Sequence, residues 1–368
     1  MKKVGIVGAG NMGSGIVQKT AQEGLVVVMV DVKDDFVVRG LNSIRTSLKE
    51  AQDRGILTAE QVEEVLARIR GTSNLSGVKD CDLVIEVIFE ELEAKKKLFA
   101  DLDRICDEKT IFATNTSSFS VNELAAVTSR PDRFVGLHFF YHPAKNKLLE
   151  IIPGSKSSPT VIAAAREYAK LTGKRDILVQ DSPGFAVNRF FQPFLNEAVR
   201  VLDEGIANIP TIEKAAMDFL GTGMGPFLLM NVTGIPIGYH TQNTLHKKLG
   251  DFYVPAKGLI NQFEFGQAWN LEGEVAENKF NAIRERLLGS IFFTTTSLLD
   301  EGVTNIPDMD VGAKVALRWR QGPFEIMNAV GIEKSCDMVA HLLEPYPKVS
   351  LPPVLTAQKE KGVPWDVD

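Results

Sequence analysis

The first 31 residues switch between strand-like and helix-like spacing of hydrophobic positions. The segment KKVGIVGAGNMGSGIVQKTAQEG predicts a short strand, a glycine turn and a helix with apolar positions Ile16, Val17 and Ala21. A second apolar run, LVVVMVD, follows and ends at Asp31. Strand, turn, helix, strand and terminal acid together predict the opening unit of a nucleotide-binding α/β fold.

Two helical stretches interrupt this alternation over about 34–70. In the first, apolar residues recur at steps of three and four, and the basic residues Arg45 and Lys49 lie off that stripe. The second opens with a capping box from Thr58 to Gln61. Such an inserted pair is a candidate lid. Arg45 and Lys49 fit either a solvated helix face or contacts with an anionic substrate.

Five further apolar runs predict the remaining strands of a parallel sheet, at 82–89, 110–118, 133–140, 147–153 and 175–181. Polar residues lie at or just past several strand ends, where parallel sheets bind their ligands. These residues are Glu90, Asn115, Ser117 and His138. We therefore expect them to belong to one site.

The glycine turn has the spacing GxGxxG, at Gly8, Gly10 and Gly13. In this motif the first glycine permits a tight turn, the second lets the backbone approach a pyrophosphate, and the third lets helix and strand pack closely. Asn11 and Met12 open the helix whose N-terminus would face the phosphates, and they are cofactor-binding candidates too. The alternative is a glycine turn that serves packing alone.

Asp31 lies 18 residues beyond Gly13, where a carboxylate can accept hydrogen bonds from a ribose 2′-hydroxyl. The same carboxylate would repel a 2′-phosphate. The sequence therefore favours NAD over NADP as the cofactor, although the nearby Lys33 weakens this argument.

Two of the five histidines, His138 and His142, lie four residues apart in GLHFFYHPAKNKLLE. The segment is strand-like, so the two rings would be roughly 13 Å apart at about 3.3 Å per residue, too far for one metal ion. No metal site is predicted. Histidine changes its charge near neutral pH, which suits His138 as a general base, and Glu150 on the next strand would orient its ring. A purely structural histidine is the alternative.

The second half contains an internal repeat. LDEGIANIPTIEKAAMDFLGTGMGPFLLMNVTG starts at Leu202 and LDEGVTNIPDMDVGAKVALRWRQGPFEIMNAVG at Leu299, with 15 of 33 positions identical at an offset of 97. We predict an α/β Rossmann-type NAD-binding domain over 1–182, followed by an all-α C-terminal region of two repeated helical domains, 183–280 and 281–368. The second copy has no glycine motif, so we expect it to serve architecture.

The chain resembles the L-3-hydroxyacyl-CoA dehydrogenase family over almost its whole length, through GAGNMGSGI, VIEVIFEELEAKKKLF, NTSS, RPDRFVGLHFF, KLLEII, DSPGFAVNRF and GPF. The resemblance implies NAD-dependent oxidation of a 3-hydroxyacyl-CoA to a 3-oxoacyl-CoA. It also implies residue roles. These are His138 as base with Glu150 as its partner, Ser117 and Asn188 at the reacting oxygen or thioester, and Glu90, Lys95 and Asn115 along the cofactor site.

One position departs from the family pattern. Members commonly have HFFN followed by proline, whereas this chain has Tyr141 and His142 there and proline one residue later. The asparagine often assigned to substrate positioning is therefore missing. Tyr141 could donate a hydrogen bond in its place or reshape the acyl pocket, so the size and branching of the acyl group are left open.

The resemblance also bears on partners. The expected ligand is an acyl-CoA thioester. Single-copy family members pair their helical domains across a homodimer, so an intrachain pair of repeats could leave this chain monomeric, with other assemblies left open. The remaining alternatives are a hydroxyacid or sugar-acid dehydrogenase of the crystallin-like branch and an inactive NAD-binding structural protein.

Charge, apolar runs and cysteine spacing indicate which partners and which cellular compartment to expect. The 41 basic and 47 acidic side chains give a net charge of −6, so no global field would attract nucleic acid or an anionic membrane. No window approaches the roughly 18 apolar residues of a membrane span. The 3 cysteines have no CxxC spacing, which indicates neither disulfides nor zinc and favours a reducing cytoplasm.

Overall fold

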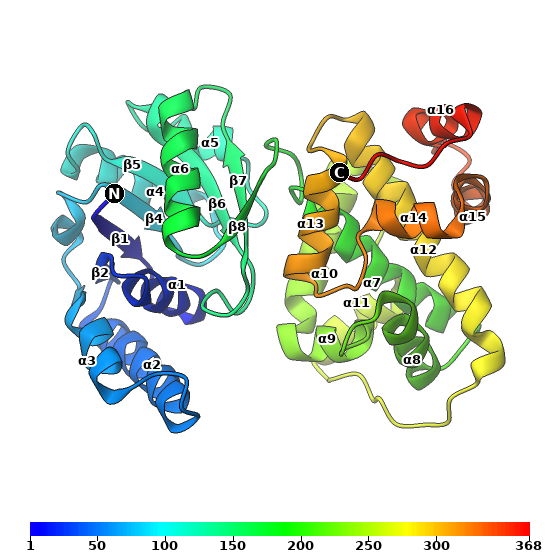
Figure 1. Cartoon of the computed structure of the whole chain (residues 1–368), viewed down its shortest axis with the longest axis horizontal. Coiled ribbons are helices and arrows are strands. Elements are labelled where there is room, and N and C mark those ends of the chain that lie inside the picture. The colour runs from blue at the N-terminus through cyan, green and yellow to red at the C-terminus, as the bar shows by residue number, and fades with distance from the viewer. The chain divides into compact units, whose positions relative to one another are not determined.

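The apolar runs of the N-terminal half join into one eight-stranded sheet in the computed structural model, which describes residues 1–368 (Figure 1). The order of strands across the sheet is β3 (Ile69–Thr72), β2 (Val26–Val30), β1 (Lys3–Val7), β4 (Leu83–Glu86), β5 (Ile111–Thr114), β6 (Phe134–Phe139), β7 (Leu148–Pro153) and β8 (Arg175–Leu178). The chain reverses its direction of winding between β1 and β4. Open α/β sheets bind nucleotides at such a switch point.

Two features of the sheet differ from the sequence prediction, which was all-parallel and lacked one strand. First, β6 and β7 run antiparallel, because only residues 140–147 connect them and a parallel crossover needs a dozen residues or more. Second, β3 was not predicted. Its sequence IRGT has one large apolar residue, Ile69, and the spacing of Ile69 continues the apolar stripe of the preceding helix. The segment is a strand because it pairs with β2.

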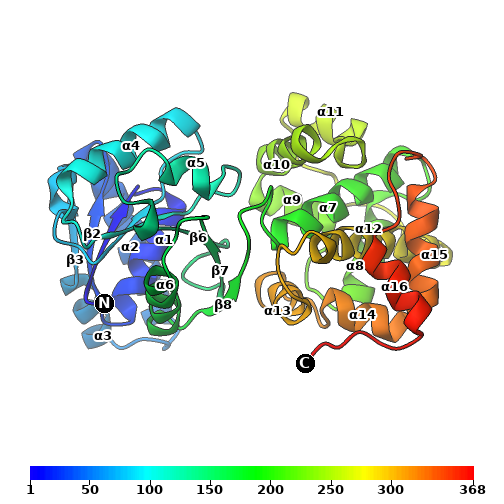
Figure 2. The ribbon, with the colours of Figure 1, turned by 90° about the horizontal axis from the view of Figure 1, so that it is seen from above.

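Helices cover both faces of this sheet, and Figure 2 shows α6 on the face opposite to α4 and α5. One face packs in an apolar core with α1 (Asn11–Gln22), α2 (Asp34–Asp53), α3 (Ala59–Ala67) and α6 (Pro159–Leu171). The other is covered by α4 (Leu92–Ile105) and α5 (Val121–Ala125), with short 3₁₀ helices η1 (Leu75–Val78) and η2 (Pro131–Arg133). The predicted inserted pair is thus α2 and α3, and the capping box at Thr58 is confirmed.

The chain divides into two compact units, Met1–Asp181 and Ser182–Asp368, and the second is entirely helical. Its helices are α7 (Val187–Asp203), α8 (Ile209–Leu220), α9 (Pro226–Thr233), α10 (Ile235–Leu249), α11 (Lys257–Phe265), α12 (Phe280–Asp300), α13 (Ile306–Ala316), α14 (Pro323–Val330), α15 (Ile332–Leu343) and α16 (Pro353–Lys361), with 3₁₀ helices η3 (Asp251–Tyr253) and η4 (Glu277–Lys279). The long helices α7 and α12 pack against each other. The predicted boundary at 280/281 stays a prediction, because 182–368 forms one unit.

The two NIP segments begin helices in the same way. Asn208 and Asn305 are the N-caps of α8 and α13, and each side chain accepts a hydrogen bond from a first-turn amide. Proline follows in the first turn, where its missing N–H costs nothing. None of the helices has both the length and the apolar run that a membrane crossing needs.

Candidate active site

His138 and Glu150 lie directly opposite each other on the antiparallel strands β6 and β7. The imidazole Nδ1 is 2.6 Å from Glu150 Oε2, and the residues are 5% and 0% exposed. Cross-strand neighbours on one face of a sheet are close enough for this contact. The predicted pairing of the two side chains is present. The carboxylate binds Nδ1 and so fixes the orientation of the ring and the direction of its second nitrogen, Nε2.

Polar side chains from four neighbouring strands share the face of the sheet that α4 and α5 cover. Phe99 of α4 packs on Phe112 and Phe134 of this face, while the alternate strand residues belong to the core under α1 and α6. The buried polar residues of this face are Glu86, Thr114, His138 and Glu150. Buried ionisable groups gathered in an otherwise apolar layer are typical of a functional site.

The loop that follows β5 brings Asn115 to this row. Its side-chain Oδ1 accepts a hydrogen bond of 2.9 Å from the backbone N–H of Phe139, the residue after His138. Ser117 lies two residues further along, half-buried, with its Oγ 3.4 Å from Ser118 Oγ. The expected neighbourhood of Asn115 and His138 is therefore present, and Ser117 lies on the same loop as Asn115.

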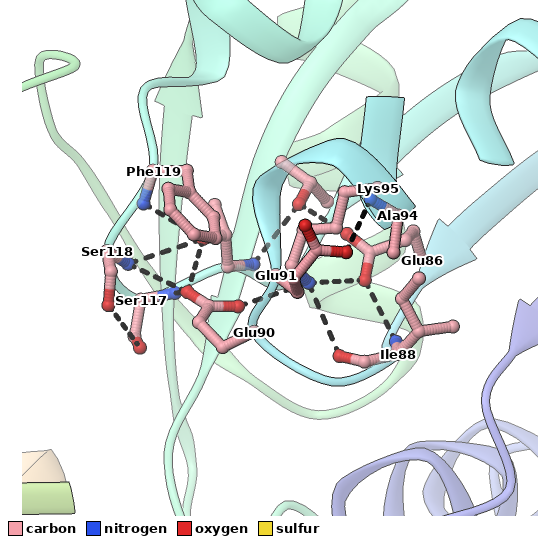
Figure 3. Close-up of polar contacts among 11 residues, drawn as sticks. Glu86, Ile88, Glu90, Glu91, Ala94, Lys95, Ser117, Ser118 and Phe119 are labelled. Atoms are coloured by element: carbon pink, nitrogen blue, oxygen red, sulfur yellow. Dashed lines mark hydrogen bonds and ion pairs between the residues drawn. The ribbon is translucent and has the colours of Figure 1, made fainter. Parts of the chain in front are cut away.

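Lys95 and Glu86 are buried and form an ionic network with Glu90, which is exposed (Figure 3). Lys95 is 1% exposed, and its Nζ lies 2.5 Å from Glu86 Oε1 and 3.1 Å from Glu90 Oε2. The only sequence signal for Glu86 was a carboxylate inside the buried strand VIEV. Sequence reasoning missed three members of the network, Glu86, Thr114 and Thr116.

The three glycines after β1 meet different steric demands. Gly8 has φ +122°, and a Cβ there would lie 2.3 Å from Val87 O. A Cβ at Gly13 would lie 1.9 Å from Gly8 O, so only glycine lets α1 pack on this loop. At Gly10 a Cβ would meet nothing within 4 Å. Packing does not explain Gly10, and the open space over its backbone fits a ligand pyrophosphate.

The start of α1 offers donors to such a ligand. Gly10 is its N-cap without a side-chain hydrogen bond, and the first turn has no acidic residue. The first amides and the positive end of the helix dipole thus remain available to an anion, next to the exposed Asn11 and half-buried Met12. Asp31 accepts a 2.7 Å hydrogen bond from Ala9 N–H. Its carboxylate thus also holds the glycine loop, a role that the sequence did not indicate.

Tyr141 and His142 lie in the connection from β6 to β7. Tyr141 is 57% exposed. His142 is half-buried, and its Nδ1 accepts a 3.2 Å hydrogen bond from Ala144 N–H. Burial lowers the pKa of His142, and the charges of Lys145 and Lys174 lower it further. His142 therefore shapes the turn, and Tyr141 is the member of the pair that a ligand can reach.

Three predicted residues belong to other parts of the chain. Arg45 and Lys49 are exposed on α2 and donate to Asn42 and Asp53. Asn188 is half-buried in the first turn of α7, in the second unit. Substrate contacts of these three side chains stay predictions.

Two family models match consecutive parts of the chain. The NAD binding domain of 3-hydroxyacyl-CoA dehydrogenase matches residues 3–182, and the C-terminal domain of the same enzyme matches 184–269. A 3-hydroxybutyryl-CoA dehydrogenase of Bradyrhizobium diazoefficiens is 36% identical over 267 residues, which cover 72% of this chain and 91% of that protein.

A longer relative and a solved structure match nearly the whole chain. The fatty acid oxidation complex subunit alpha of Shewanella amazonensis is 33% identical over 376 residues, covering 94% of this chain but 52% of that protein, so the chain spans about half its length. The crystal structure of 3-hydroxybutyryl-CoA dehydrogenase from Escherichia coli K12 has a TM-score of 0.90 over 98% of both chains; at 22% identity it shows the shared fold alone. The two family models and the Bradyrhizobium relative show that the chain belongs to the 3-hydroxyacyl-CoA dehydrogenase family.

Proposed function

We propose that the chain is an NAD-dependent L-3-hydroxyacyl-CoA dehydrogenase, which interconverts a 3-hydroxyacyl-CoA and a 3-oxoacyl-CoA. The buried contact between His138 and Glu150 carries this proposal. Oxidation of an alcohol requires a general base, and a histidine oriented by a carboxylate is suited to that task at neutral pH. Family membership supplies the substrate class.

In the oxidation direction, His138 Nε2 takes the proton of the C3 hydroxyl. Glu150 holds the ring through Nδ1 and stabilises the imidazolium that forms. NAD, when bound, supplies the hydride acceptor. Ser117 is a neutral donor to the reacting oxygen, so it stabilises developing charge without trapping the product as a cation would. In the reverse direction the imidazolium returns its proton to the developing alkoxide.

The cofactor is held by the first βαβ unit. The backbone at Gly10, Asn11 and Met12 faces the pyrophosphate, and Asp31 accepts a hydrogen bond from the adenosine ribose. Lys33, whose charge would favour NADP, lies over the Phe36 ring with its Nζ 5.7 Å from the ring centroid. The negative charge of Asp31 is therefore expected to dominate, and NADH to be preferred over NADPH.

Activity is expected on CoA thioesters and not on free hydroxy acids. Absorbance of NADH is followed with NAD⁺ and either 3-hydroxybutyryl-CoA, longer or ring-bearing 3-hydroxyacyl-CoAs, or free 3-hydroxybutyrate. Binding of the distant CoA moiety contributes to transition-state stabilisation, so kcat/KM should be at least about 100-fold higher for the best thioester. An equal or higher value for the free acid would identify a hydroxyacid dehydrogenase instead.

The second unit is proposed to contain two copies of one helical domain. Equivalent side chains make equivalent hydrogen bonds in both halves of the unit. The matched contacts are Asn208 and Asn305 at the N-caps of α8 and α13, Glu213 and Asp310 with amides that begin α9 and α14, and Asn231–Trp269 and Asn328–Trp365. Agreement of buried contacts as well as sequence supports a duplication.

Two ion pairs indicate how the copies pair. Arg189 of α7 binds Glu301, and Arg286 of α12 binds Glu204, with 2.8 Å between Nη2 and Oε1. Adding the repeat offset of 97 to Arg189 gives Arg286, and adding it to Glu204 gives Glu301. This reciprocity is what a two-fold axis between two copies produces. We therefore place the pairing of helical domains within one chain.

A monomer is the expected species in solution. Because the two copies already cover each other, a second subunit is not needed to bury the faces of α7 and α12. Sedimentation velocity at micromolar concentration should give one species near the chain mass of 40.4 kDa. A tight dimer built on the helical domains would contradict the intrachain pairing.

A cytoplasmic location completes the proposal. Cys81, Cys106 and Cys336 are all free and buried. Burial raises the pKa of the Cys81 and Cys106 thiols to about 12, which keeps them protonated and unreactive. Reduced thiols of this kind suit a reducing compartment.

A further inference from the structure

Lys174 is a buried lysine that the proposed chemistry does not use. It lies in the turn between α6 and β8 and is 8% exposed. Burial and the nearby charge of Lys19 lower its pKa to about 8, while Glu23 acts in the opposite direction. The ammonium form therefore still predominates at neutral pH. Because a buried charge is costly unless its donors are satisfied, the partners of this ammonium indicate its task.

The ammonium of Lys174 binds the connection between β6 and β7. Its Nζ donates hydrogen bonds to the backbone carbonyl oxygens of Pro143 and Asn146. The same Nζ lies 5.5 Å from the centroid of the Phe139 ring, at the end of β6. One cation from outside the connection thus joins two of its carbonyl groups.

Both carbonyl groups belong to one tight turn, residues 142–146, which we call the clamped turn. The carbonyl oxygen of His142 accepts hydrogen bonds of 2.8 Å from both Lys145 N–H and Asn146 N–H. These two bonds close the turn within itself. The buried ammonium then connects the closed turn to the start of β8, so its position relative to the sheet is set from outside.

The clamped turn also packs on α1. A Cβ at Gly15 would lie 2.5 Å from Pro143 Cγ and 3.2 Å from His142 Cε1. Only glycine therefore lets the helix and the turn approach this closely. Two contacts fix the turn, one with α1 and one with Lys174.

Tyr141 directly precedes the clamped turn, three residues after the base His138. Asn146 connects it to the turn, because Asn146 Nδ2 donates a 3.4 Å hydrogen bond to Tyr141 O, and Asn146 Oδ1 accepts one of 3.1 Å from Leu148 N–H. The Tyr141 residue is 57% exposed. Its backbone is thus tied to the turn, while its side chain is accessible to a ligand.

We propose that Lys174 is a positioning residue, which holds the clamped turn and through it places Tyr141 against the acyl group of the substrate. The inference rests on the proposed function, because it takes the substrate to be an acyl-CoA bound beside His138. A tyrosine on a fixed backbone loses little conformational entropy when it meets a ligand, so its contact contributes more to affinity than a contact from a mobile loop.

The test compares Lys174→Met with Lys170→Met. Both variants remove one positive charge, but Lys170 is exposed on α6. Lys174→Met should raise the KM for acetoacetyl-CoA about tenfold and leave kcat within about threefold, because Tyr141 contributes to binding and not to the chemical step. The Kd of NADH, measured by fluorescence titration, should stay within about threefold of the wild-type value. Lys170→Met should match the wild type in all three.

A double-variant cycle shows whether Lys174 acts through Tyr141. Tyr141→Ala should itself raise the KM about tenfold, and adding Lys174→Met should then change the KM by less than about twofold, because the side chain to be positioned is gone. Asn146→Ala keeps the lysine and both carbonyl groups but removes the side-chain link to Tyr141, so it tests the same connection if Lys174→Met does not fold. It should also raise the KM, and should do so only while Tyr141 is present.

Amide hydrogen exchange reports on the clamped turn without any need for turnover. The amides of Lys145 and Asn146, which close the turn, should exchange faster in Lys174→Met than in the wild type. In Lys170→Met they should exchange at the wild-type rate.

Three outcomes would overturn the inference. The first is a Lys174→Met variant with the KM and the amide exchange of the wild type. The second is an effect of Lys174→Met on the KM that persists undiminished in the Tyr141→Ala background. The third is a weaker affinity for NADH with an unchanged KM for the thioester, since it would place Lys174 at the cofactor.

The proposed function is tested separately by the wild type. If the wild type turns over only a bulkier 3-oxoacyl-CoA, that thioester replaces acetoacetyl-CoA in the same comparisons. A wild type without activity on any thioester would refute the proposed function and with it the substrate contact of Tyr141. Amide exchange would still decide whether Lys174 holds the clamped turn.

Discussion

His138→Gln is expected to lower kcat for 3-hydroxyacyl-CoA oxidation by about 10²- to 10⁴-fold, the usual contribution of a general base. Glutamine has a similar reach, and its amide can donate to Glu150, which leaves no carboxylate without a partner at this buried position. The side chain cannot take the hydroxyl proton. Because the glycine loop is unchanged, the Kd of NADH should stay within about twofold of the wild-type value.

Glu150→Gln serves as the companion variant in the same assay. It keeps the histidine but removes the charge that stabilises the imidazolium and selects the tautomer with the proton on Nδ1. We expect a lower kcat with unchanged NADH affinity, and a double variant no slower than His138→Gln, since the two residues act as one unit. Turnover of His138→Gln within about threefold of the wild type would contradict the assignment of the base.

Gly13→Ala is expected to lose stability and Gly10→Ala to lose NADH affinity, although both add the same methyl group three residues apart. At Gly13 the methyl would lie 1.9 Å from the Gly8 carbonyl oxygen, so the backbone must shift. Overpacking of this kind costs about 1–3 kcal/mol in the free energy of unfolding. At Gly10 the backbone is extended and the space is open, so the unfolding free energy should be unchanged or slightly higher.

NADH binding distinguishes Gly10→Ala from a control variant. Gly10→Ala should fold normally, but the Kd of NADH should rise by about tenfold or more, because the methyl group occupies space for the pyrophosphate. A tenfold rise corresponds to a loss of about 1.4 kcal/mol of binding free energy. Gly223→Ala is the matched control, since that glycine also has open space around its Cβ position. Thermal unfolding with and without NADH measures both effects. Wild-type NADH affinity in Gly10→Ala would remove the cofactor explanation of this glycine.

Features encoded in adjacent residues were predictable from the sequence. Gly8 has a positive φ and Gly13 lies against the Gly8 carbonyl, so both answer demands within the motif, and the capping box at Thr58 needs only residues three apart. The contact of His138 with Glu150 followed from two consecutive strands, even though the predicted parallel direction of those strands was wrong. The short connection 140–147 was visible in the sequence and would have indicated the antiparallel hairpin.

Features that depend on packing between distant segments were not predictable. Lys95 is one of three consecutive lysines, a pattern typical of a solvated helix face, and only the packing of α4 on the sheet buries it beside Glu86. Thr116 resembles any loop threonine until Glu90 is placed next to it. β3 exists because β2 offers an edge for pairing, which a four-residue window does not contain.

The most direct test of the account is the rate of NADH oxidation with acetoacetyl-CoA, measured for the wild type and for His138→Gln in the same preparation conditions. We predict saturable turnover by the wild type and loss of that turnover in His138→Gln, with NADH binding retained in both. Saturable turnover that survives in His138→Gln would contradict the role of the His138–Glu150 pair. Absence of turnover by the wild type on acetoacetyl-CoA and on bulkier 3-oxoacyl-CoAs would contradict the proposed dehydrogenase itself.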